Sequence, residues 1–301
     1  MPDSEKFYRY KVGTIEVTVV HDGRRTFPLP DKFVVNATKD EVNAALEAAS
    51  LPRDEMTIHF NPLALKIGGK TVVIDTGNGA AAHAASGGAV GQSAANLAAS
   101  GIDPADVDAV VISHFHGDHI NGLIDADNKS VFPNSKIFVP AAEWDFWMNA
   151  DQRSRAPAGR KDAFDNAWRV FDDGLKRNVT RYEWGRDVLP GLRAVETAGH
   201  TPGHTSFVLS SGADRLFIQS DVTNHPALFV RNPGWRAAFD MDGEQAGRTR
   251  RRVYDMLVSE GLKVQAFHYP FPSFGYIEKD GDRYRVVSGT APEPVKQGVN
   301  P

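Results

Sequence analysis

Residues 113–119, with the sequence Ser-His-Phe-His-Gly-Asp-His, constrain this chain more than any other stretch. Imidazole and carboxylate groups at such density suit zinc or a similar transition metal. The apolar run of residues 109–112 comes directly before them and is typical of a buried parallel strand. Because open α/β sheets place their sites at the carboxyl ends of strands, this loop is predicted to bind metal. The alternative is a polar loop whose histidines only bond backbone, and it does not account for four ligand-type side chains so close together.

Composition limits what else the chain can be. It has 301 residues, 41% of them hydrophobic, which is enough to build a large core. The net charge of −4 gives no electrostatic reason to expect nucleic acid or an anionic membrane as a partner. There is no cysteine, so any metal must be held by histidine, aspartate or glutamate. No apolar run approaches the roughly 20 residues of a transmembrane helix. No apolar signal region follows the polar residues 1–6, so a cytoplasmic protein is expected.

Further ligand candidates also stand at the ends of predicted strands. Residues 198–206, Ala-Gly-His-Thr-Pro-Gly-His-Thr-Ser, follow the strand 192–197. Their glycines allow the backbone to come close to a metal. Asp221 and His268 each end a further strand with an apolar centre. These segments are therefore expected to meet the loop at 113–119.

The pattern His114-x-His116-x-Asp118-His119 resembles the signature of the metallo-β-lactamase-fold hydrolases. Residues 74–77, Ile-Asp-Thr-Gly, and residues 198–206 resemble two further motifs of that family, and the resemblance covers about residues 58–290. It implies an αββα sandwich of two mixed β-sheets flanked by helices. The expected organisation is a single domain, residues 1–301, built of two similar halves at about 1–190 and 191–301. The site would lie along their shared edge.

The same resemblance implies a dinuclear metal site. The first metal would take His114, His116 and His200, and the second Asp118, His119 and His268. Asp221 and a solvent hydroxide would bridge the two ions, and Asp118 and Asp221 are the expected catalytic residues. The ions are expected to be zinc, with manganese, cobalt and iron as alternatives. Asp75 is expected to bond a ligand or backbone near the site, and His204 to orient the turn rather than bind metal.

The resemblance implies a hydrolase for a small, apolar ester-type substrate. Two divalent cations would generate hydroxide at neutral pH, to attack a lactone, an aryl ester or an organophosphate triester. The absence of cysteine and the presence of Asp221 favour the lactonase and methyl parathion hydrolase-like side of the family over true β-lactamases. A thioester hydrolase of the glyoxalase II type is an alternative, but only 33 residues follow His268, too few for its helical domain. A mononuclear-iron persulfide dioxygenase is a second alternative, but it would need fewer than the seven ligand residues present here. A non-catalytic binding module on a degenerate fold is a third, but it would have lost some of these ligands.

Aromatic residues supply the candidates for substrate binding. The segment 144–147 and the segment after His268 resemble pocket-lining stretches of broad-specificity family members, although a place in the core is the alternative for the tryptophans. Asn224 is expected either to orient substrate or to cap the turn before Pro226. The complete set of expected substrate contacts is Trp144, Trp147, His225, Phe271 and Phe274.

Two segments outside the motifs also carry expectations. Residues of about 30–55 form an N-terminal excursion, with Thr38 and Glu41 as a capping box that opens a helix. This excursion is expected to cover the active site, to form a homodimer contact, or to be a plain surface feature. The helix 242–261 carries four arginines, Arg248, Arg250, Arg251 and Arg252, which are predicted to form a solvated face rather than an anion site.

Overall fold

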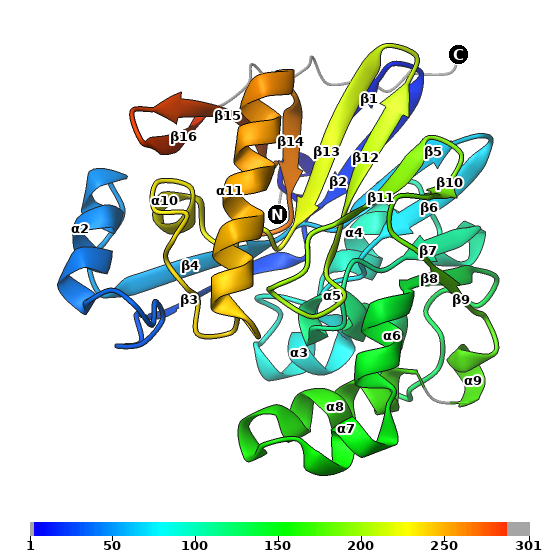
Figure 1. Cartoon of the computed structure of the whole chain (residues 1–301). Helices are drawn as coiled ribbons and strands as arrows, with labels where there is room; N and C mark the ends of the chain where they lie inside the picture. Colours follow the sequence, from blue (N-terminus) through cyan, green and yellow to red (C-terminus); the bar gives the residue numbers. More distant parts are fainter. Residues whose placement is uncertain (1–2, 172, 288–301) are drawn as a thin grey trace.

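The computed structural model describes residues 3–171 and 173–287 and shows two seven-stranded sheets with helices on their outer faces (Figure 1). This arrangement confirms the predicted αββα sandwich. The strands of the first sheet, in spatial order, are β1 (Phe7–Val12), β2 (Ile15–Val20), β5 (Leu63–Ile67), β6 (Lys70–Ile74), β7 (Ala109–Val111), β8 (Lys136–Pro140) and β9 (Val179–Tyr182). The strands of the second are β10 (Asp187–Leu189), β11 (Leu192–Glu196), β12 (Thr205–Ser211), β13 (Asp214–Ser220), β14 (Lys263–Ala266), β15 (Phe274–Asp280) and β16 (Arg283–Val287).

Helices and short 3-10 turns connect these strands. They are α1 (Asp3–Lys6), α2 (Lys39–Ala48), α3 (Gly79–Ala85), α4 (Ser93–Ala99), η1 (Pro104–Asp106), α5 (Gly117–Ile120), η2 (Asn121–Leu123), α6 (Ala141–Trp147), α7 (Ala150–Arg155), α8 (Ala158–Val170), α9 (Asp173–Lys176), α10 (Pro226–Phe229) and α11 (Gly243–Glu260). Within the described ranges, none of them is both long and apolar enough to cross a bilayer.

Parallel pairing is confined to the part of each sheet that leads to the polar loops. β6, β7, β8 and β9 are parallel neighbours, and β13 and β14 form the parallel pair of the second sheet. All three residues of β7 are buried, as expected for a strand covered on both faces. The carboxyl ends of these strands therefore open toward one edge of the sandwich, where the loops carrying His114, Asp221 and His268 begin.

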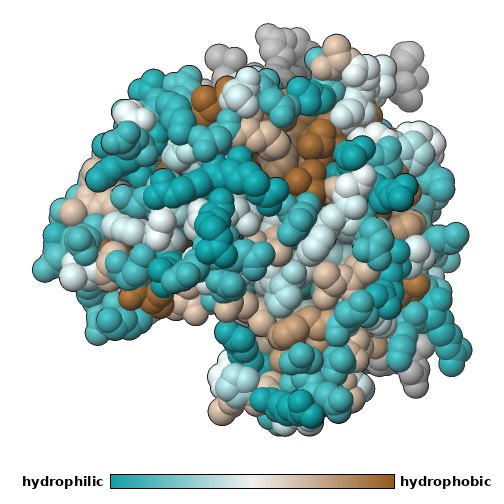
Figure 2. Space-filling model, in the orientation of Figure 1, coloured by the Kyte–Doolittle hydropathy of each residue, from teal (hydrophilic) through white to brown (hydrophobic). Residues whose placement is uncertain are grey.

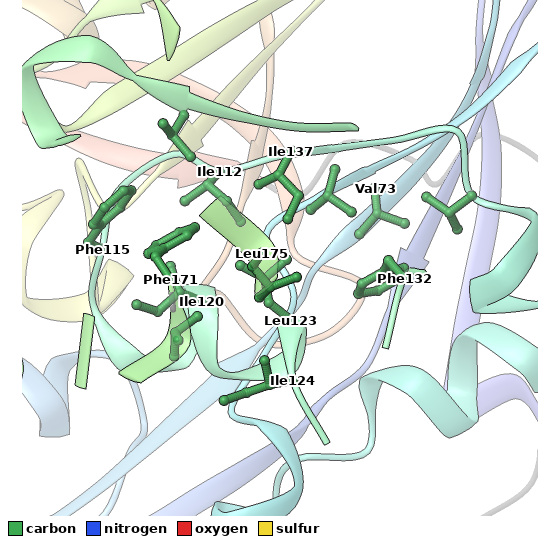
Figure 3. Close-up of a cluster of buried hydrophobic side chains, with 14 of the residues drawn as sticks. Val73, Ile112, Phe115, Ile120, Leu123, Ile124, Phe132, Ile137, Phe171 and Leu175 are labelled. Atoms are coloured by element: carbon green, nitrogen blue, oxygen red, sulfur yellow. The ribbon is translucent and has the colours of Figure 1, made fainter. Parts of the chain in front are cut away.

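Buried apolar side chains fill the space between the sheets and the outer face of each. The outer cluster on the first sheet includes Ile112, Phe115 and Phe171 (Figure 3). The Phe115 ring stacks on Phe171 with centroids 4.6 Å apart, and Phe115 is 1% exposed. Phe115 lies between His114 and His116 in sequence, so its burial anchors the predicted metal loop to the core.

The N-terminal excursion lies between the two strands of a separate ribbon, β3 (Gly23–Pro28) and β4 (Glu55–Phe60). The capping box is confirmed, because the Thr38 side chain accepts from the Glu41 amide and the Glu41 carboxylate accepts from the Thr38 amide at 2.7 Å. Figure 2 shows a face covered mainly by hydrophilic residues, with hydrophobic ones in separate patches. Val35 and Leu51, 47% and 38% exposed, are the large hydrophobic residues exposed in the described chain, and both lie in the excursion. A homodimer contact through this segment remains a prediction.

The structure corrects one expectation about α11. The helix begins after Asp242, whose carboxylate accepts from the Glu244 and Gln245 amides, and ends at Gly261 in the left-handed conformation. Arg248, Arg251 and Arg252 are exposed as predicted, but Arg250 is only 2% exposed. The physical reason is helical spacing, because position 250 falls on the face of the buried residues 246, 253 and 257.

Candidate metal centre

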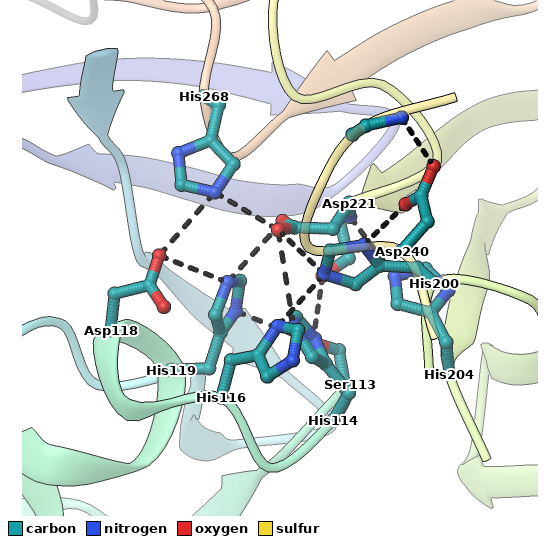
Figure 4. A network of polar contacts seen from close by, with 12 residues as sticks. Ser113, His114, His116, Asp118, His119, His200, His204, Asp221, Asp240 and His268 are labelled. Carbon is teal, nitrogen blue, oxygen red and sulfur yellow. Dashed lines mark hydrogen bonds and ion pairs between the residues drawn. The ribbon is translucent and has the colours of Figure 1, made fainter. Parts of the chain in front are cut away.

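All seven predicted metal ligands converge at the edge where β7, β13 and β14 end (Figure 4). His114 and His116 lie in the loop after β7, and Asp118 and His119 lie on the short helix α5 that follows. The other ligands come from the second sheet, namely His200 between β11 and β12, Asp221 after β13 and His268 after β14. Their ligand atoms form three overlapping groups: His114, His116 and His200; His114, His119 and Asp221; Asp118, His119 and His268.

Three imidazole nitrogens meet in the first group. His116 Nδ1 lies 3.1 Å from His114 Nε2 and 2.9 Å from His200 Nε2. Neutral imidazole carries one lone pair and one N–H, so three nitrogens facing one another cannot all be satisfied by hydrogen bonds among themselves. A cation among them would satisfy all three.

Asp221 faces both the group of His114, His116 and His200 and the group of Asp118, His119 and His268. Its Oδ2 is 3.3 Å from His200 Nε2 and 3.0 Å from His268 Nε2, and its Oδ1 is 3.3 Å from His119 Nε2. Asp118 Oδ2 is 3.4 Å from His268 Nε2 and 3.6 Å from His119 Nε2. The single Asp221 carboxylate therefore faces both ligand sets.

The outer ring nitrogens fix the direction of the inner ones. His119 Nδ1 lies 2.8 Å from Asp75, His200 Nδ1 lies 2.9 Å from Asp240, and His268 Nδ1 lies 2.8 Å from the His59 carbonyl. Carboxylate and carbonyl oxygens accept hydrogen bonds, so each Nδ1 carries the proton and each Nε2 presents its lone pair to the centre. This orientation by a neighbouring acceptor is characteristic of histidine that binds metal.

The hydrogen bonding of the buried ligand atoms indicates whether a metal ion fits this site. His119 Nε2 and Asp221 Oδ1 are buried and lie 3.3 Å apart, but neither makes an aligned hydrogen bond with the other or with any other described residue. Buried polar atoms are nearly always paired, so atoms of this kind require a partner that the protein itself does not provide. Nitrogen and carboxylate donors without thiolate suit divalent transition metals. The residues at this site fit such ions.

Burial and neighbouring charges shift the pKa values of the metal-free site in different directions. Burial, helped by the neighbouring His200, lowers the pKa of His116 to about 3. Burial acts in the same direction on His200, but hydrogen bonds and charge from Asp221 and Asp240 outweigh it and raise its pKa to about 9. Burial also opposes ionisation of Asp221, yet the nearby His268 and His119 hold the pKa of its carboxyl well below the ordinary value. The Asp221 carboxylate is therefore ionised in the metal-free site, where the protonated His200 imidazole lies beside it.

Two buried carboxylates that bind no metal hold the ligand loops. Asp75, at the end of β6, accepts from the Ser113 amide at 2.8 Å and from the Ser113 hydroxyl at 2.7 Å, in addition to its bond with His119. This agrees with the role predicted for Asp75. Glu143 accepts from the Phe115 amide at 3.0 Å and the Gly203 amide at 2.7 Å, so it ties the first ligand loop to the His200 turn.

Gly203 and His204, in the turn that carries His200, are each explained by a local contact. A Cβ on Gly203 would lie 2.2 Å from the backbone nitrogen of Glu143, so only glycine permits this approach. His204 Nε2 accepts from the Asp221 amide at 3.0 Å, and its Nδ1 lies 2.9 Å from the Thr197 hydroxyl. His204 therefore orients the backbone of Asp221, in line with the role expected from the sequence.

Asp240 and Arg250 are functional neighbours that the sequence reasoning missed. Asp240 is bonded to His200 and lies 3.5 Å from the Arg250 guanidinium, with both side chains at most 2% exposed. Arg250 also donates to the carbonyls of Val222 and Trp235, each at 2.8 Å. The helical spacing of position 250 was a usable signal for its burial, whereas nothing in the local sequence marks Asp240.

We expect Asp75→Asn to weaken metal binding and any metal-dependent activity by roughly 10- to 100-fold, because the carboxylate that holds the His119 proton is replaced by a neutral amide. Asp75 has φ of 56°, a conformation that asparagine also tolerates, so the backbone is preserved. Metal content and affinity of the purified variant are the measurements. Asp54→Asn is the matched control, because Asp54 also has φ of 56° but is exposed and not among the ligands. Equal metal affinity in the two variants would contradict this role for Asp75.

The residues that line the cleft over the ligands differ from those expected. The cleft has a volume of about 390 Å³, and its apolar wall consists of Phe27, Phe33, Ile58, Phe60 and Phe239. These come from the β3–β4 ribbon, the excursion and the loop before α11. The excursion therefore contributes to covering the candidate site, through Phe33.

None of the five substrate contacts expected from the sequence lines this cleft. Trp147 is 1% exposed and donates to Glu143 at 2.9 Å, and Trp144 packs on the same core cluster. Phe274 packs on Tyr8 and Tyr10, with centroids 5.8 and 5.4 Å away. Phe271 lies against His21, with centroids 4.9 Å apart, and His225 lines a separate cavity of about 540 Å³ between α2, α10 and β16. Trp144, Trp147 and Phe274 lie away from the cleft because they pack against apolar side chains of the core.

Comparison with known proteins agrees with the geometry. The family model described as the metallo-beta-lactamase superfamily matches residues 61–259. The chain belongs to this superfamily. This membership confirms the resemblance noted in the motifs.

Characterised members of the metallo-beta-lactamase superfamily include relatives with partial sequence similarity. An N-acyl homoserine lactonase, AttM of Azorhizobium caulinodans, is 33% identical over 192 residues, which cover 60% of this chain and 65% of that protein. The AttM protein of Agrobacterium fabrum is 32% identical over 116 residues, 38% of this chain and 40% of that protein. The chain thus matches less than two thirds of the length of each relative.

Two solved structures match nearly the whole chain. AidC, described as a dizinc quorum-quenching lactonase in complex with a product, superposes with a TM-score of 0.88 at 23% identity, covering 96% of this chain and 99% of AidC. The hydrolase AbOPH superposes with a TM-score of 0.85 at 25% identity, covering 94% and 97% of the two chains. The shared fold therefore extends beyond the segment matched by the family model.

Proposed function

We propose that this protein is a dinuclear-metal hydrolase whose substrates are N-acyl lactones. The convergence of five histidines and two aspartates, with Asp221 facing both ligand sets, is the observation that supports the proposal most strongly. Zinc is the metal we expect, with manganese, cobalt and iron as alternatives. The lactonase activity of AttM and the dizinc description of AidC point the same way.

The cleft suits an uncharged ester with an apolar tail. Its wall consists of four phenylalanines and one isoleucine, and its polar floor consists mainly of the proposed ligands. Apolar walls with a few polar groups that fix orientation are usual for small-molecule sites. A lactone ring would lie over the ligands, and an acyl chain would lie against the rings of Phe33, Phe60 and Phe239.

The two ions, when bound, would lower the pKa of a water molecule and stabilise the charge that develops on the substrate's carbonyl oxygen. Asp118 is the proposed ligand best placed to move a proton. Its side chain is 24% exposed at the cleft, whereas those of His119 and Asp221 are 0% and 3% exposed. Asp118 would therefore take a proton from the attacking water and pass it to the leaving oxygen as the ring opens, while Asp221 keeps the ligand sets together.

One experiment tests this function against its alternatives. The purified protein is loaded with zinc, its metal content is measured, and it is assayed in parallel on N-hexanoyl-homoserine lactone, an aryl ester, an aryl phosphotriester and a thioester. We expect two metal ions per chain and the highest kcat/KM for the lactone. Turnover of the thioester alone would favour the glyoxalase II type of activity and refute the proposal. Before zinc is added, the metal content of the protein as purified is measured and the protein is assayed on a persulfide. One bound iron with oxygen uptake would instead support a dioxygenase.

A further inference from the structure

Asn224 occupies a position that the ligand set alone does not explain. It follows Asp221 by three residues, in the turn from β13 to α10, and it lines the cleft together with Asp221 and His268. The residue is 7% exposed, so its carboxamide is largely removed from water. It is therefore a polar group at the floor of a cleft whose wall is apolar.

The Asn224 side-chain oxygen lacks a hydrogen-bond partner in the part of the chain that the structure describes. This atom, Oδ1, is buried. Had Asn224 capped the turn before Pro226, its side chain would bond the backbone there. Instead, the N-cap of α10 is His225, and no side-chain capping bond is made there. Buried side-chain acceptors are nearly always paired, so an unpaired one in a binding cleft is expected to receive a donor from a ligand.

The other residues that line the cleft indicate which kind of donor would pair with the Asn224 oxygen. The phenylalanine rings and Ile58 of the cleft wall offer neither donors nor acceptors, and the other polar groups lining the cleft are ligands whose free atoms face the metal centre. Asn224 is therefore the polar side chain of the cleft lining that lies outside the proposed ligand set, and its oxygen is the acceptor left for a substrate N–H once the ligands hold metal. We infer that Asn224 is a specificity-determining residue that accepts a hydrogen bond from an amide N–H next to the scissile carbonyl, an inference that rests on the proposed function.

A hydrogen bond to Asn224 would discriminate between substrates that make the same contacts with the apolar wall. N-acyl lactones carry an amide N–H on the carbon beside the ring carbonyl. Simple lactones, aryl esters and phosphotriesters without nitrogen carry no such donor, and they would leave the Asn224 oxygen unpaired in a desolvated site. A site built to hydrogen-bond a substrate group discriminates against analogues that lack the group.

The test uses a pair of substrates that differ in one atom. N-hexanoyl-homoserine lactone is compared with 2-hexanoyloxy-γ-butyrolactone, in which an oxygen replaces the N–H. For the zinc-loaded wild-type protein we expect kcat/KM to favour the amide by about tenfold, the effect of one hydrogen bond between neutral groups. In Asn224→Leu and Asn224→Ala the ratio should fall to about one. Binding of the ring-opened amide and ester products, measured by calorimetry, should show the same loss of discrimination.

A second variant in the same cleft serves as the matched control. Ile58→Ala shortens the apolar wall, which both substrates contact equally, so it should lower both kcat/KM values by a common factor and preserve the ratio. Metal content and melting temperature establish that each variant is folded and loaded, and Asn224→Ala replaces Asn224→Leu if the larger side chain prevents folding.

The outcomes distinguish the inference from the proposed function. If both lactones are hydrolysed at equal rates by the wild-type protein, or if the Asn224 variants retain the preference for the amide, the role of Asn224 is refuted while the lactonase proposal stands. If the wild-type protein binds metal but opens neither lactone, the proposed function fails and the inference fails with it.

Discussion

Asp221→Asn is expected to lower kcat/KM by about 10³-fold or more and to reduce the metal content from two ions to one or none. The charge stabilisation supplied by metals amounts to several kcal/mol, and each 1.36 kcal/mol corresponds to a factor of ten in rate. Asp221 is 3.0–3.3 Å from nitrogens of His119, His200 and His268, so a neutral amide at this position withdraws the negative charge from both ligand sets at once.

Elemental analysis together with steady-state kinetics on the lactone tests this prediction. The matched control is Asp214→Asn, because Asp214 begins the same strand at the exposed end remote from the ligands. That control is expected to keep wild-type metal content and activity. Retention of two ions and of activity within tenfold by Asp221→Asn would show that Asp221 does not join the two ligand sets.

Arg250→Met is expected to lower the free energy of unfolding by about 3–5 kcal/mol, which is the cost of breaking a buried ion pair by removing one partner. The variant would remove the guanidinium that lies 3.5 Å from the buried Asp240 carboxylate and leave it with His200 and the Ala237 amide as partners. It would also remove the donor from the carbonyls of Val222 and Trp235. Since Asp240 holds His200, weaker metal binding should accompany the loss of stability.

Urea denaturation of the metal-free proteins measures this effect without the contribution of bound ions. Arg248→Met makes the same substitution on the exposed side of α11 and should change the free energy of unfolding by no more than about 0.5 kcal/mol. Similar stability of the two variants would mean that the pair between Arg250 and Asp240 does not hold the His200 region.

The candidate metal site could be located from the sequence because each of its parts is marked locally. Four of the ligands fall within residues 114–119, and the others end strands with apolar centres. Parallel strands bring their carboxyl ends to one edge of a sheet, so ligand-type residues at these positions meet in space. Family resemblance then placed the pieces relative to each other, and the structure brings all of them together.

The substrate-contacting residues could not be located in the same way. The aromatic residues 144 and 147 lie on α6, where they pack on the outer core of the first sheet instead of reaching the cleft. The rings that line the cleft, such as Phe33 and Phe239, stand far apart in sequence and approach to 5.6 Å between centroids. Aromatic side chains are common in both cores and pockets, so their presence does not distinguish the two locations.

The sequence by itself determined the fold class, through motifs that resemble those of the superfamily, and it marked the candidate ligands, because coordination chemistry depends on residue types at short spacing. Only the tertiary structure decided which side chains line the cleft, that Arg250 is buried against Asp240, and that the Asn224 oxygen has no partner. Burial and hydrogen-bond pairing depend on neighbours contributed by distant segments, and those neighbours exist only once the two sheets have packed face to face.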